Sequence, residues 1–291
     1  MGSMGATTAP LSTVAVGDLT ITYLPDGASH LRPLAAYVGS DEQTWREQGH
    51  LLDDNGWLVM SVGALLVQDG RSNTLIDVGM GPHVQDVGEA SGGLFEGDIG
   101  GGSLLVSLAR VGLRPDDIDD VVFSHLHTDH VGWVETGGAA TFSRANYHVG
   151  ADELAYWGAS SAVGGPTAAQ LEVLARRLTL IAGDRTVLPG IDAVATPGHT
   201  PGHLSLVVSS GTERAVILGD MMHCPIEIGA TELDFAFDVD PQLARETKRR
   251  IERELSKPDT VTVGAHFPDP VFGRVLPGSA PFSVTFRGGT S

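Results

Sequence analysis

The distribution of apolar and polar residues predicts several strands in the N-terminal part of the chain. Apolar residues either alternate with polar ones or run together, which predicts strands at 19–24, 57–60, 63–67 and 73–76. Pro25-Asp26-Gly27 predicts a turn after the first of these strands. Gln68-Asp69-Gly70 predicts the turn of a hairpin that joins the last two.

Three segments have the apolar spacing that is typical of helices. The first two cover residues 103–111 and 167–178. A third helix is expected to follow Asp240, whose side chain can cap a helix, with Pro241 at its first position. Its stripe of every fourth residue comprises Leu243, Thr247, Ile251 and Leu255. We expect its charged residues to form a solvated face. These are Arg245, Glu246, Lys248, Arg249, Arg250, Glu252, Arg253 and Glu254.

Strand and helix patterns alternate along the chain without repeats or low-complexity segments. A chain of 291 residues is long enough to bury a large core in one domain. We therefore expect a single mixed α/β or α+β domain over residues 16–291, preceded by a tail of residues 1–15. Met1-Gly2-Ser3 before a second methionine, Met4, is typical of a remnant of an expression tag.

Charge and composition argue against several classes of partner. The chain has 36 Asp and Glu but 18 Lys and Arg, and its net charge of −18 disfavours nucleic acids and anionic membranes. It contains neither an apolar run of about 18 residues nor the pattern of a secretory signal. Its one cysteine, Cys224, excludes an internal disulfide. The default expectation is a cytoplasmic protein that acts on a small molecule, with a homodimer left open.

The segment His125-Leu126-His127-Thr128-Asp129-His130 predicts a metal site. It directly follows an apolar run at 121–123, so a strand delivers it to the edge of a sheet. In an extended backbone the first two histidines point to the same side and can bind one ion. The aspartate and the third histidine lie on the following turn and can reach a second ion. Imidazole and carboxylate groups suit zinc and its transition-metal neighbours, so a metal explains this segment better than a solvated loop does.

Three further segments present residue types that bind metals. A Pro-Gly-His turn occurs twice in succession and ends first in His199 and then in His203. Apolar runs that predict buried strands end in Asp220 and in His266. The chain therefore places metal-binding groups at the ends of several strands.

Four features follow one another along the chain: the H-x-H-x-D-H loop, the Thr-Pro-Gly-His turn, the Gly-Asp pair and the strand-end histidine. In this order they resemble the pattern of the metallo-β-lactamase fold superfamily. The resemblance runs from about residue 18 to the C-terminal region. It implies a four-layer αβ/βα sandwich with the metal loops along one edge, between two sheets. Asp77 lies in an Asp-x-Gly motif at the end of an early strand. The resemblance implies that its carboxylate supports the metal ligands without binding the metal itself. The implied ligands are His125, His127 and His199 for one metal, Asp129, His130 and His266 for the other, and Asp220 bridging the two.

Such a site implies two divalent transition-metal ions, with zinc favoured and iron, manganese or cobalt as alternatives. Two ions about 3.5–4 Å apart can share a bridging water and lower its pKa, which yields a hydroxide that attacks a carbonyl or phosphoryl centre. Asp129 is expected to orient this hydroxide and to pass its proton to the leaving group. No Gly-x-Ser-x-Gly motif is evident, which argues against a serine nucleophile.

The segments 219–223, 235–241 and 264–268 resemble the branch that contains methyl parathion hydrolase and the N-acyl-homoserine lactone lactonases. This resemblance implies a hydrolase of a lactone, ester or related small neutral substrate. A thioesterase and a β-lactamase-type hydrolase are alternatives within the family. An iron-dependent oxygenase or redox protein on the same fold, or a scaffold without activity, are alternatives of other classes. The complete second ligand set favours hydrolysis.

Several other residues near the predicted centre can be interpreted in two ways. We expect His223 to contact the substrate at the rim of the site, with a plain loop imidazole as the alternative. We expect His203 to be a supporting residue rather than a ligand, and Cys224 to be a packed thiol. An apolar wall for an acyl or aryl group is expected, with core packing as the alternative. Its residues are Met221, Met222, Phe235 and Phe237.

Overall fold

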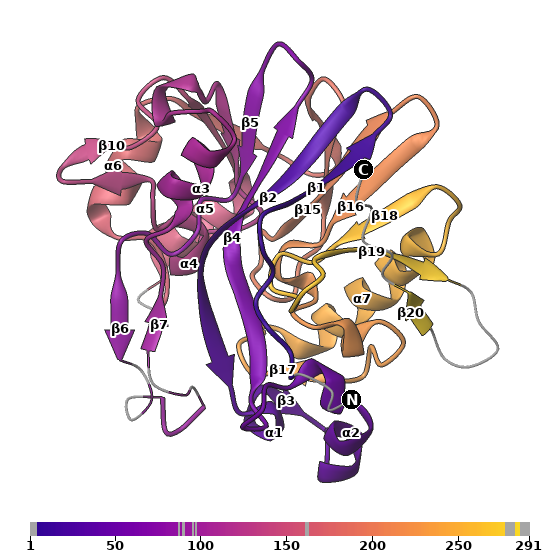
Figure 1. Cartoon of the computed structure of the whole chain (residues 1–291). Helices are drawn as coiled ribbons and strands as arrows, with labels where there is room; N and C mark the ends of the chain where they lie inside the picture. The colour runs from indigo at the N-terminus through magenta and orange to yellow at the C-terminus, as the bar shows by residue number, and fades with distance from the viewer. Residues whose placement is uncertain are drawn as a thin grey trace.

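Two β-sheets pack face to face in the computed structural model (Figure 1), which describes residues 5–86, 88, 91–94, 96, 98–160, 163–276 and 283–285. In the larger sheet the strands lie in the order β12-β11-β8-β5-β4-β2-β7-β6, and β1 pairs with β2. Its strands are β1 (Ser12–Val16), β2 (Leu19–Leu31), β4 (Leu58–Gln68), β5 (Asn73–Ile76), β6 (Val84–Asp86), β7 (Asp98–Gly100), β8 (Asp120–Val122), β11 (Asn146–Gly150) and β12 (Leu178–Ile181).

The smaller sheet has the order β13-β14-β15-β16-β18-β19-β20 and is antiparallel except for the parallel pair β16 and β18. Two short ribbons, β9 with β10 and β3 with β17, lie outside the main sheets. The remaining strands are β3 (Tyr37–Val38), β9 (Glu135–Thr136), β10 (Ala139–Ala140), β13 (Arg185–Leu188), β14 (Ile191–Ala195), β15 (Leu204–Ser210), β16 (Glu213–Ile217), β17 (Asp234–Phe235), β18 (Thr260–Val263), β19 (Phe272–Leu276) and β20 (Ser283–Thr285).

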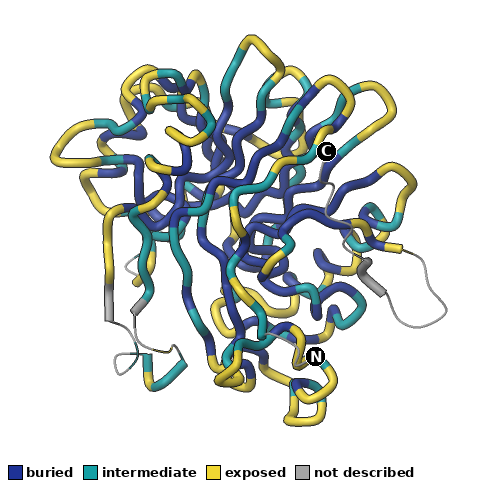
Figure 2. Tube along the Cα trace, viewed as in Figure 1, coloured by how far each residue is buried: buried dark blue, intermediate teal, exposed yellow. Residues whose placement is uncertain are grey.

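Helices cover the outer faces of both sheets, so the predicted four-layer αβ/βα sandwich is confirmed. Apolar residues of α3, α5 and α6 form one buried cluster with the larger sheet, and residues of α7 form another with the smaller sheet. A third cluster fills the space between the sheets, and the buried trace is concentrated there in Figure 2. The helices are α1 (Pro33–Ala36), α2 (Glu42–Glu47), α3 (Leu104–Arg110), α4 (Thr128–Val131), α5 (Ala151–Ala159), α6 (Ala168–Ala175) and α7 (Pro241–Leu255).

Most of the predicted elements are present, and the differences have physical causes. α6 ends at Ala175, because Leu178 begins β12. The predicted turn at 25–27 is wrong, since β2 continues through it with a bulge. The bulge turns Asp26 inward, where its carboxylate accepts hydrogen bonds from the backbone of Met80 and Leu104.

The expected tail of residues 1–15 is wrong for the part that the structure describes. β1 pairs with β2 along its whole length, and Thr8 forms a bridge with Pro268. Ala9 is buried and donates its N–H to the hydroxyl of Ser61. This segment belongs to the fold because its backbone groups are paired with the sheet and its apolar residues join the core.

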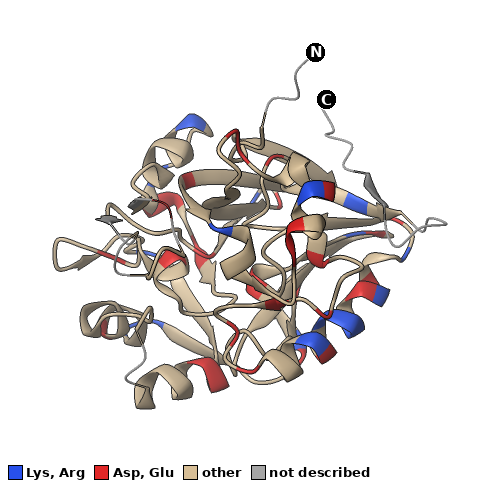
Figure 3. Ribbon diagram, turned by 90° about the horizontal axis from the view of Figure 1, so that it is seen from below, with Lys and Arg blue, Asp and Glu red and all other residues tan. Residues whose placement is uncertain are grey.

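The charged face predicted for α7 is also wrong at one position. Lys248 is 0% exposed, whereas its neighbour Arg249 is exposed. Figure 3 shows acidic residues spread over many segments, and basic residues that gather on α7 and are otherwise scattered. None of the helices in the described ranges is both long and apolar enough to cross a membrane.

Candidate metal centre

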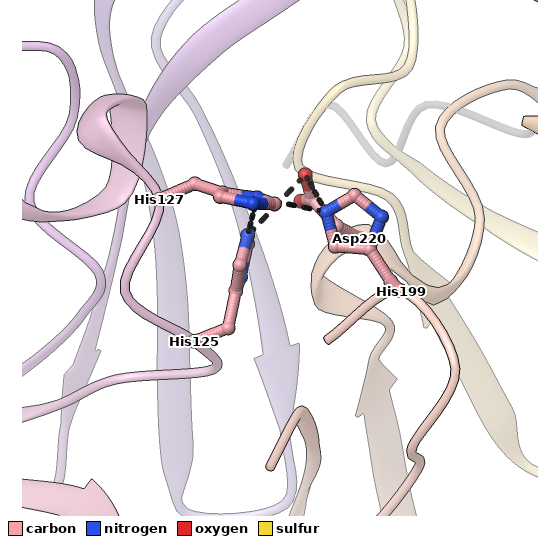
Figure 4. A group of neighbouring side chains, drawn as sticks. All are labelled: His125, His127, His199 and Asp220. Atoms are coloured by element: carbon pink, nitrogen blue, oxygen red, sulfur yellow. Dashed lines mark hydrogen bonds and ion pairs between the residues drawn. The ribbon is translucent and has the colours of Figure 1, made fainter. Parts of the chain in front are cut away.

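The ends of β8, β14 and β16 bring four metal-binding side chains together. One donor atom from each of His125, His127, His199 and Asp220 lies within 4.8 Å of all the others. His125 and His127 extend from one loop, and His199 and Asp220 point toward them from two others (Figure 4). His125 Nε2 and His199 Nε2 lie 2.8 and 2.9 Å from His127 Nδ1. This spacing places three ring nitrogens around one point, as a bound ion requires.

A second group adjoins the first. Donor atoms of Asp129, His130 and His266 also lie within 4.8 Å of one another. His130 Nε2 is 3.2 Å from His266 Nε2, and Asp129 Oδ2 is 3.5 Å from the same atom of His266. The Asp129 side chain is 29% exposed, against 2% for each of the two histidines. It therefore forms the solvent-facing side of this group.

Asp220 lies between the two groups and directs one carboxylate oxygen at each. Its Oδ1 is 3.1 Å from Nε2 of both His130 and His266. Its Oδ2 is 3.5 Å from His199 Nε2 and 3.7 Å from His125 Nε2. The buried Oδ1 accepts no hydrogen bond within the described residues, so it is available to an ion. A carboxylate in this position can bridge two metals.

The outward nitrogens of the histidines fit the same use. Nδ1 of His130 lies 2.8 Å from Asp77 Oδ2, and Nδ1 of His266 lies 2.7 Å from the carbonyl of Ser61. Because these acceptors require Nδ1 to carry the proton, Nε2 keeps its lone pair for a metal. The Nδ1 atoms of His125 and His199 face Ser124 Oγ and Asp238 Oδ1 in the same way.

The ionisation of the imidazoles depends on the carboxylates beside them. Burial lowers the pKa of His127 and of His199 to about 3, so both are neutral near pH 7, the form that binds metal. Burial also disfavours the charge on His130, but Asp220 and Asp77 outweigh it and raise its pKa well above the usual value. A metal ion at His130 would therefore displace a proton.

Asp77 holds the loop that follows β8. Its carboxylate accepts hydrogen bonds from the backbone N–H of Ser124 at 2.8 Å and from the Ser124 hydroxyl at 2.7 Å, besides its contact with His130. Asp77 has a φ of 57°, an uncommon backbone conformation for an aspartate. The fold maintains this conformation where it orients a candidate ligand.

Sequence reasoning missed Glu153, which ties two of the loops together. Its buried carboxylate accepts from the N–H of Leu126, between the first two histidines, at 3.0 Å. The other oxygen accepts from the Thr200 hydroxyl at 2.6 Å and from Gly202 N–H at 3.2 Å. A Cβ at Gly202 would lie 1.9 Å from the Glu153 nitrogen, so only glycine allows this approach. Neither a motif nor a strand end marks Glu153 in the sequence.

His203 and His223 differ in their contacts. His203 Nε2 accepts a hydrogen bond from the backbone N–H of Asp220 at 2.9 Å, which suits a supporting residue. His223 Nε2 lies 3.2 Å from Asp220 Oδ2, and the ring stacks on Phe235 with centroids 3.6 Å apart. His223 is only 1% exposed. The expected position at the rim is therefore wrong: His223 lies inside the centre.

The expected apolar wall is mostly wrong. Met221 and Met222 belong to the core cluster beneath α7, because the tight turn after β16 directs them there. Phe235 is 3% exposed and packs in another core cluster with Tyr37. Of the four residues, Phe237 alone is open to solvent, at 43% exposure, with its ring 5.6 Å from that of Phe235.

Known proteins share this sequence pattern. The family model of the metallo-beta-lactamase superfamily matches residues 59–266, a range that contains both groups of donors. The N-acyl homoserine lactonase AiiA of Bacillus thuringiensis subsp. kurstaki is 27% identical over 223 residues, which cover 72% of this chain and 82% of that protein. Metallo-beta-lactamase domain-containing protein 1 of Xenopus laevis is 31% identical over 182 residues, 60% of each chain.

Solved structures share the fold. AidC, described as a dizinc quorum-quenching lactonase in complex with a product, has a TM-score of 0.81 at 22% identity and covers 97% of this chain and 99% of that one. The hydrolase AbOPH has a TM-score of 0.78 at 24% identity and covers 98% of this chain and 100% of that one. Because the family match covers the larger part of the sequence, the chain belongs to the metallo-beta-lactamase superfamily and is a metal-dependent hydrolase.

Proposed function

We propose that the chain opens neutral lactone rings, those of N-acyl homoserine lactones in particular, at a centre of two transition-metal ions. The observation that carries this proposal is the carboxylate of Asp220, which faces both donor groups with one oxygen each. The resemblance in sequence to N-acyl homoserine lactonases supports the substrate class.

The donor chemistry fits two zinc ions. Neutral imidazoles whose outward nitrogens are hydrogen-bonded, together with carboxylates, are the usual surroundings of hydrolytic zinc. We assign His125, His127 and His199 to one ion, Asp129, His130 and His266 to the other, and Asp220 to both. Two ions bound in this way would activate a water molecule and polarise the lactone carbonyl.

Asp129 is the proton carrier in this proposal. When water adds to the ring carbonyl and the ring C–O bond breaks, one proton must move from the water to the departing oxygen. Asp129 Oδ2 lies 3.5 Å from His266 Nε2, and the side chain faces the open side of the centre, from which water and substrate would enter. Burial opposes the charge of Asp129, but His130 and His266 lower its pKa, so the carboxylate is ionised near pH 7, which is the form of a proton acceptor.

His223 and Phe237 are the residues that we propose contact the substrate. The Nε2 atom of His223 faces Asp220 Oδ2 at 3.2 Å, and neither ring nitrogen makes a hydrogen bond within the described residues, so a substrate oxygen bound beside Asp220 would be a partner for this ring. Phe237 extends the stack of His223 and Phe235 toward solvent. Val38, on the strand that pairs with β17, is 59% exposed. An acyl chain would find apolar surface on this side.

A hydrolysis screen of the zinc-loaded protein tests the proposal. The panel contains acyl homoserine lactones, aryl esters, thioesters, β-lactams and phosphotriesters at equal concentration. We expect the highest kcat/KM with a lactone. A lactone rate no higher than that of the buffer, with another class hydrolysed, would reject the proposed substrate while leaving hydrolysis intact.

A further inference from the structure

Lys248 is a buried cation that is connected to the metal centre through two carboxylates. It is 0% exposed, and its Nζ lies 2.7 Å from Glu227 Oε2 and 3.7 Å from Asp238 Oδ2. It also donates a hydrogen bond to the carbonyl of Leu233 at 3.2 Å. A buried ammonium is costly unless it is paired, so these contacts fix the side chain in one position.

One carboxylate leads from Lys248 to a candidate metal ligand. Oδ1 of Asp238, the oxygen farther from Lys248, lies 3.1 Å from Nδ1 of His199. The Nε2 atom of the same ring faces His127 and Asp220. The partner of the outward nitrogen sets the orientation of a metal-binding imidazole. Displacement of Asp238 would therefore rotate His199 away from its ion.

The other carboxylate leads to the non-ligand histidine. Glu227 Oε1 accepts hydrogen bonds from the backbone N–H of His223 at 2.6 Å and from the hydroxyl of Tyr37 at 2.8 Å. Nδ1 of His223 is 3.8 Å from the same oxygen. Glu227 therefore fixes the loop that presents His223 to Asp220.

Electrostatic attraction couples Lys248 to Glu227 and Asp238. Burial opposes the charge of Glu227, but Lys248 lowers its pKa to about 2. Burial likewise opposes the charge of Lys248, and the two carboxylates together raise its pKa. Burial raises the pKa of Asp238, which lies farther from the ammonium. Loss of Lys248 would leave both carboxylates buried without their ammonium partner.

We infer that Lys248 is a positioning residue of the metal centre, which holds His199 through Asp238 and His223 through Glu227. The role of His223 in turnover rests on the proposed function. The effect on metal retention rests only on His199 being a metal ligand, and it is independent of the proposed substrate.

The test compares Lys248→Met with Ile251→Ala. The first removes the charge at similar side-chain length, and the second removes core packing on the same helix, where Ile251 is buried. Zinc retention is measured by competition with a chelator at a temperature at which both variants are folded, and kcat is measured with any substrate that the wild type hydrolyses. We expect Lys248→Met to lower zinc retention and kcat each by roughly 10- to 100-fold. Ile251→Ala should keep both values, as should Arg249→Met at an exposed cation of α7.

Two further variants test the contact through Asp238 and the contact through Glu227 separately. They also test the inference if Lys248→Met does not fold. Asp238→Asn should lower zinc retention, whereas Glu227→Gln should lower kcat and keep zinc. The inference is overturned if Lys248→Met behaves like Ile251→Ala, or if Asp238→Asn keeps zinc and Glu227→Gln keeps kcat. If the wild type hydrolyses no substrate, zinc retention alone decides on Lys248, and the proposed function fails separately.

Discussion

The carboxylate of Glu153 accepts a hydrogen bond from the backbone N–H of Leu126 at 3.0 Å. Leu126 separates His125 from His127, and the other oxygen of Glu153 reaches the turn after His199. One buried side chain of α5 thus contacts two of the three loops that carry the first group of donors. Glu153 links these two loops through backbone N–H groups and the Thr200 hydroxyl.

Glu153→Gln should weaken metal binding. The amide keeps the size of the side chain but offers one acceptor oxygen where the carboxylate offers two, so at least one backbone donor is left unpaired. We expect zinc affinity to fall by roughly 10- to 100-fold and stability by about 1–3 kcal/mol. Competition with a chelator and urea unfolding measure the two effects. Asp152→Asn, at an exposed position of the same helix, is the control, and equal zinc affinity in the two variants would contradict the role of Glu153.

Asp129 and His203 should respond differently to substitution. Asp129→Asn removes the charge of a candidate ligand and proton carrier, so kcat should fall roughly 100-fold or more. His203→Ala removes the acceptor for the N–H of Asp220 and the partner of the Thr196 hydroxyl, and it should cost mainly stability. Steady-state kinetics and thermal unfolding of both variants check this difference. Similarly mild losses of kcat in the two would mean that the ligand assignment is wrong.

Phe237→Ala should affect long acyl chains more than short ones. If the exposed ring covers the chain, each methylene that it shields is worth up to about 0.8 kcal/mol, so the increase in KM should grow with chain length. A series of lactones with chains of increasing length provides the measurement. Met222→Ala is the control, because this core residue should change stability without a dependence on chain length. A KM effect of Phe237→Ala that is constant along the series would remove this ring from the substrate site.

The pair of Glu227 and Lys248 should make stability depend on pH in the acid range. The pKa of Glu227 falls from 4.5 to about 2 in the folded chain, so its carboxylate stabilises the fold fully above about pH 4.5. This contribution, roughly 3 kcal/mol, is lost as the pH falls from 4.5 toward 2. Urea unfolding of metal-free wild type and Glu227→Gln should give a stability difference that shrinks over this range. A difference that stays constant or grows would exclude the ion pair as its source.

The candidate ligands could be predicted from the sequence because each lies in a local motif at a strand end. The order of His125, Asp220 and His266 along the chain is enough to suggest one centre. Of their outer partners, only Asp77 is implied by the family resemblance, and it contacts His130. The others could not be predicted, since Asp238 and Ser61 contact their histidines across 39 and 205 positions of the chain. Such contacts depend on how the two sheets pack.

The burial of Lys248 could not be predicted from the sequence either. Its place in a run of charged residues favours a solvated position, and only the fold reveals the carboxylates of Glu227 and Asp238 beneath it. Met221 and Phe237 have similar hydrophobicity and lie in neighbouring segments, yet one is core and the other exposed. Composition does not distinguish these outcomes, because burial depends on the direction of each turn.

Metal titration of the stripped protein tests the central claim most directly. Metal is removed with a chelator and its absence verified by elemental analysis, and zinc is then added stepwise while the opening of an acyl homoserine lactone is followed. We predict no turnover without metal and a rise in rate that levels off at about two ions per chain. Full turnover by the verified metal-free protein, or a plateau at about one ion per chain, would contradict the account.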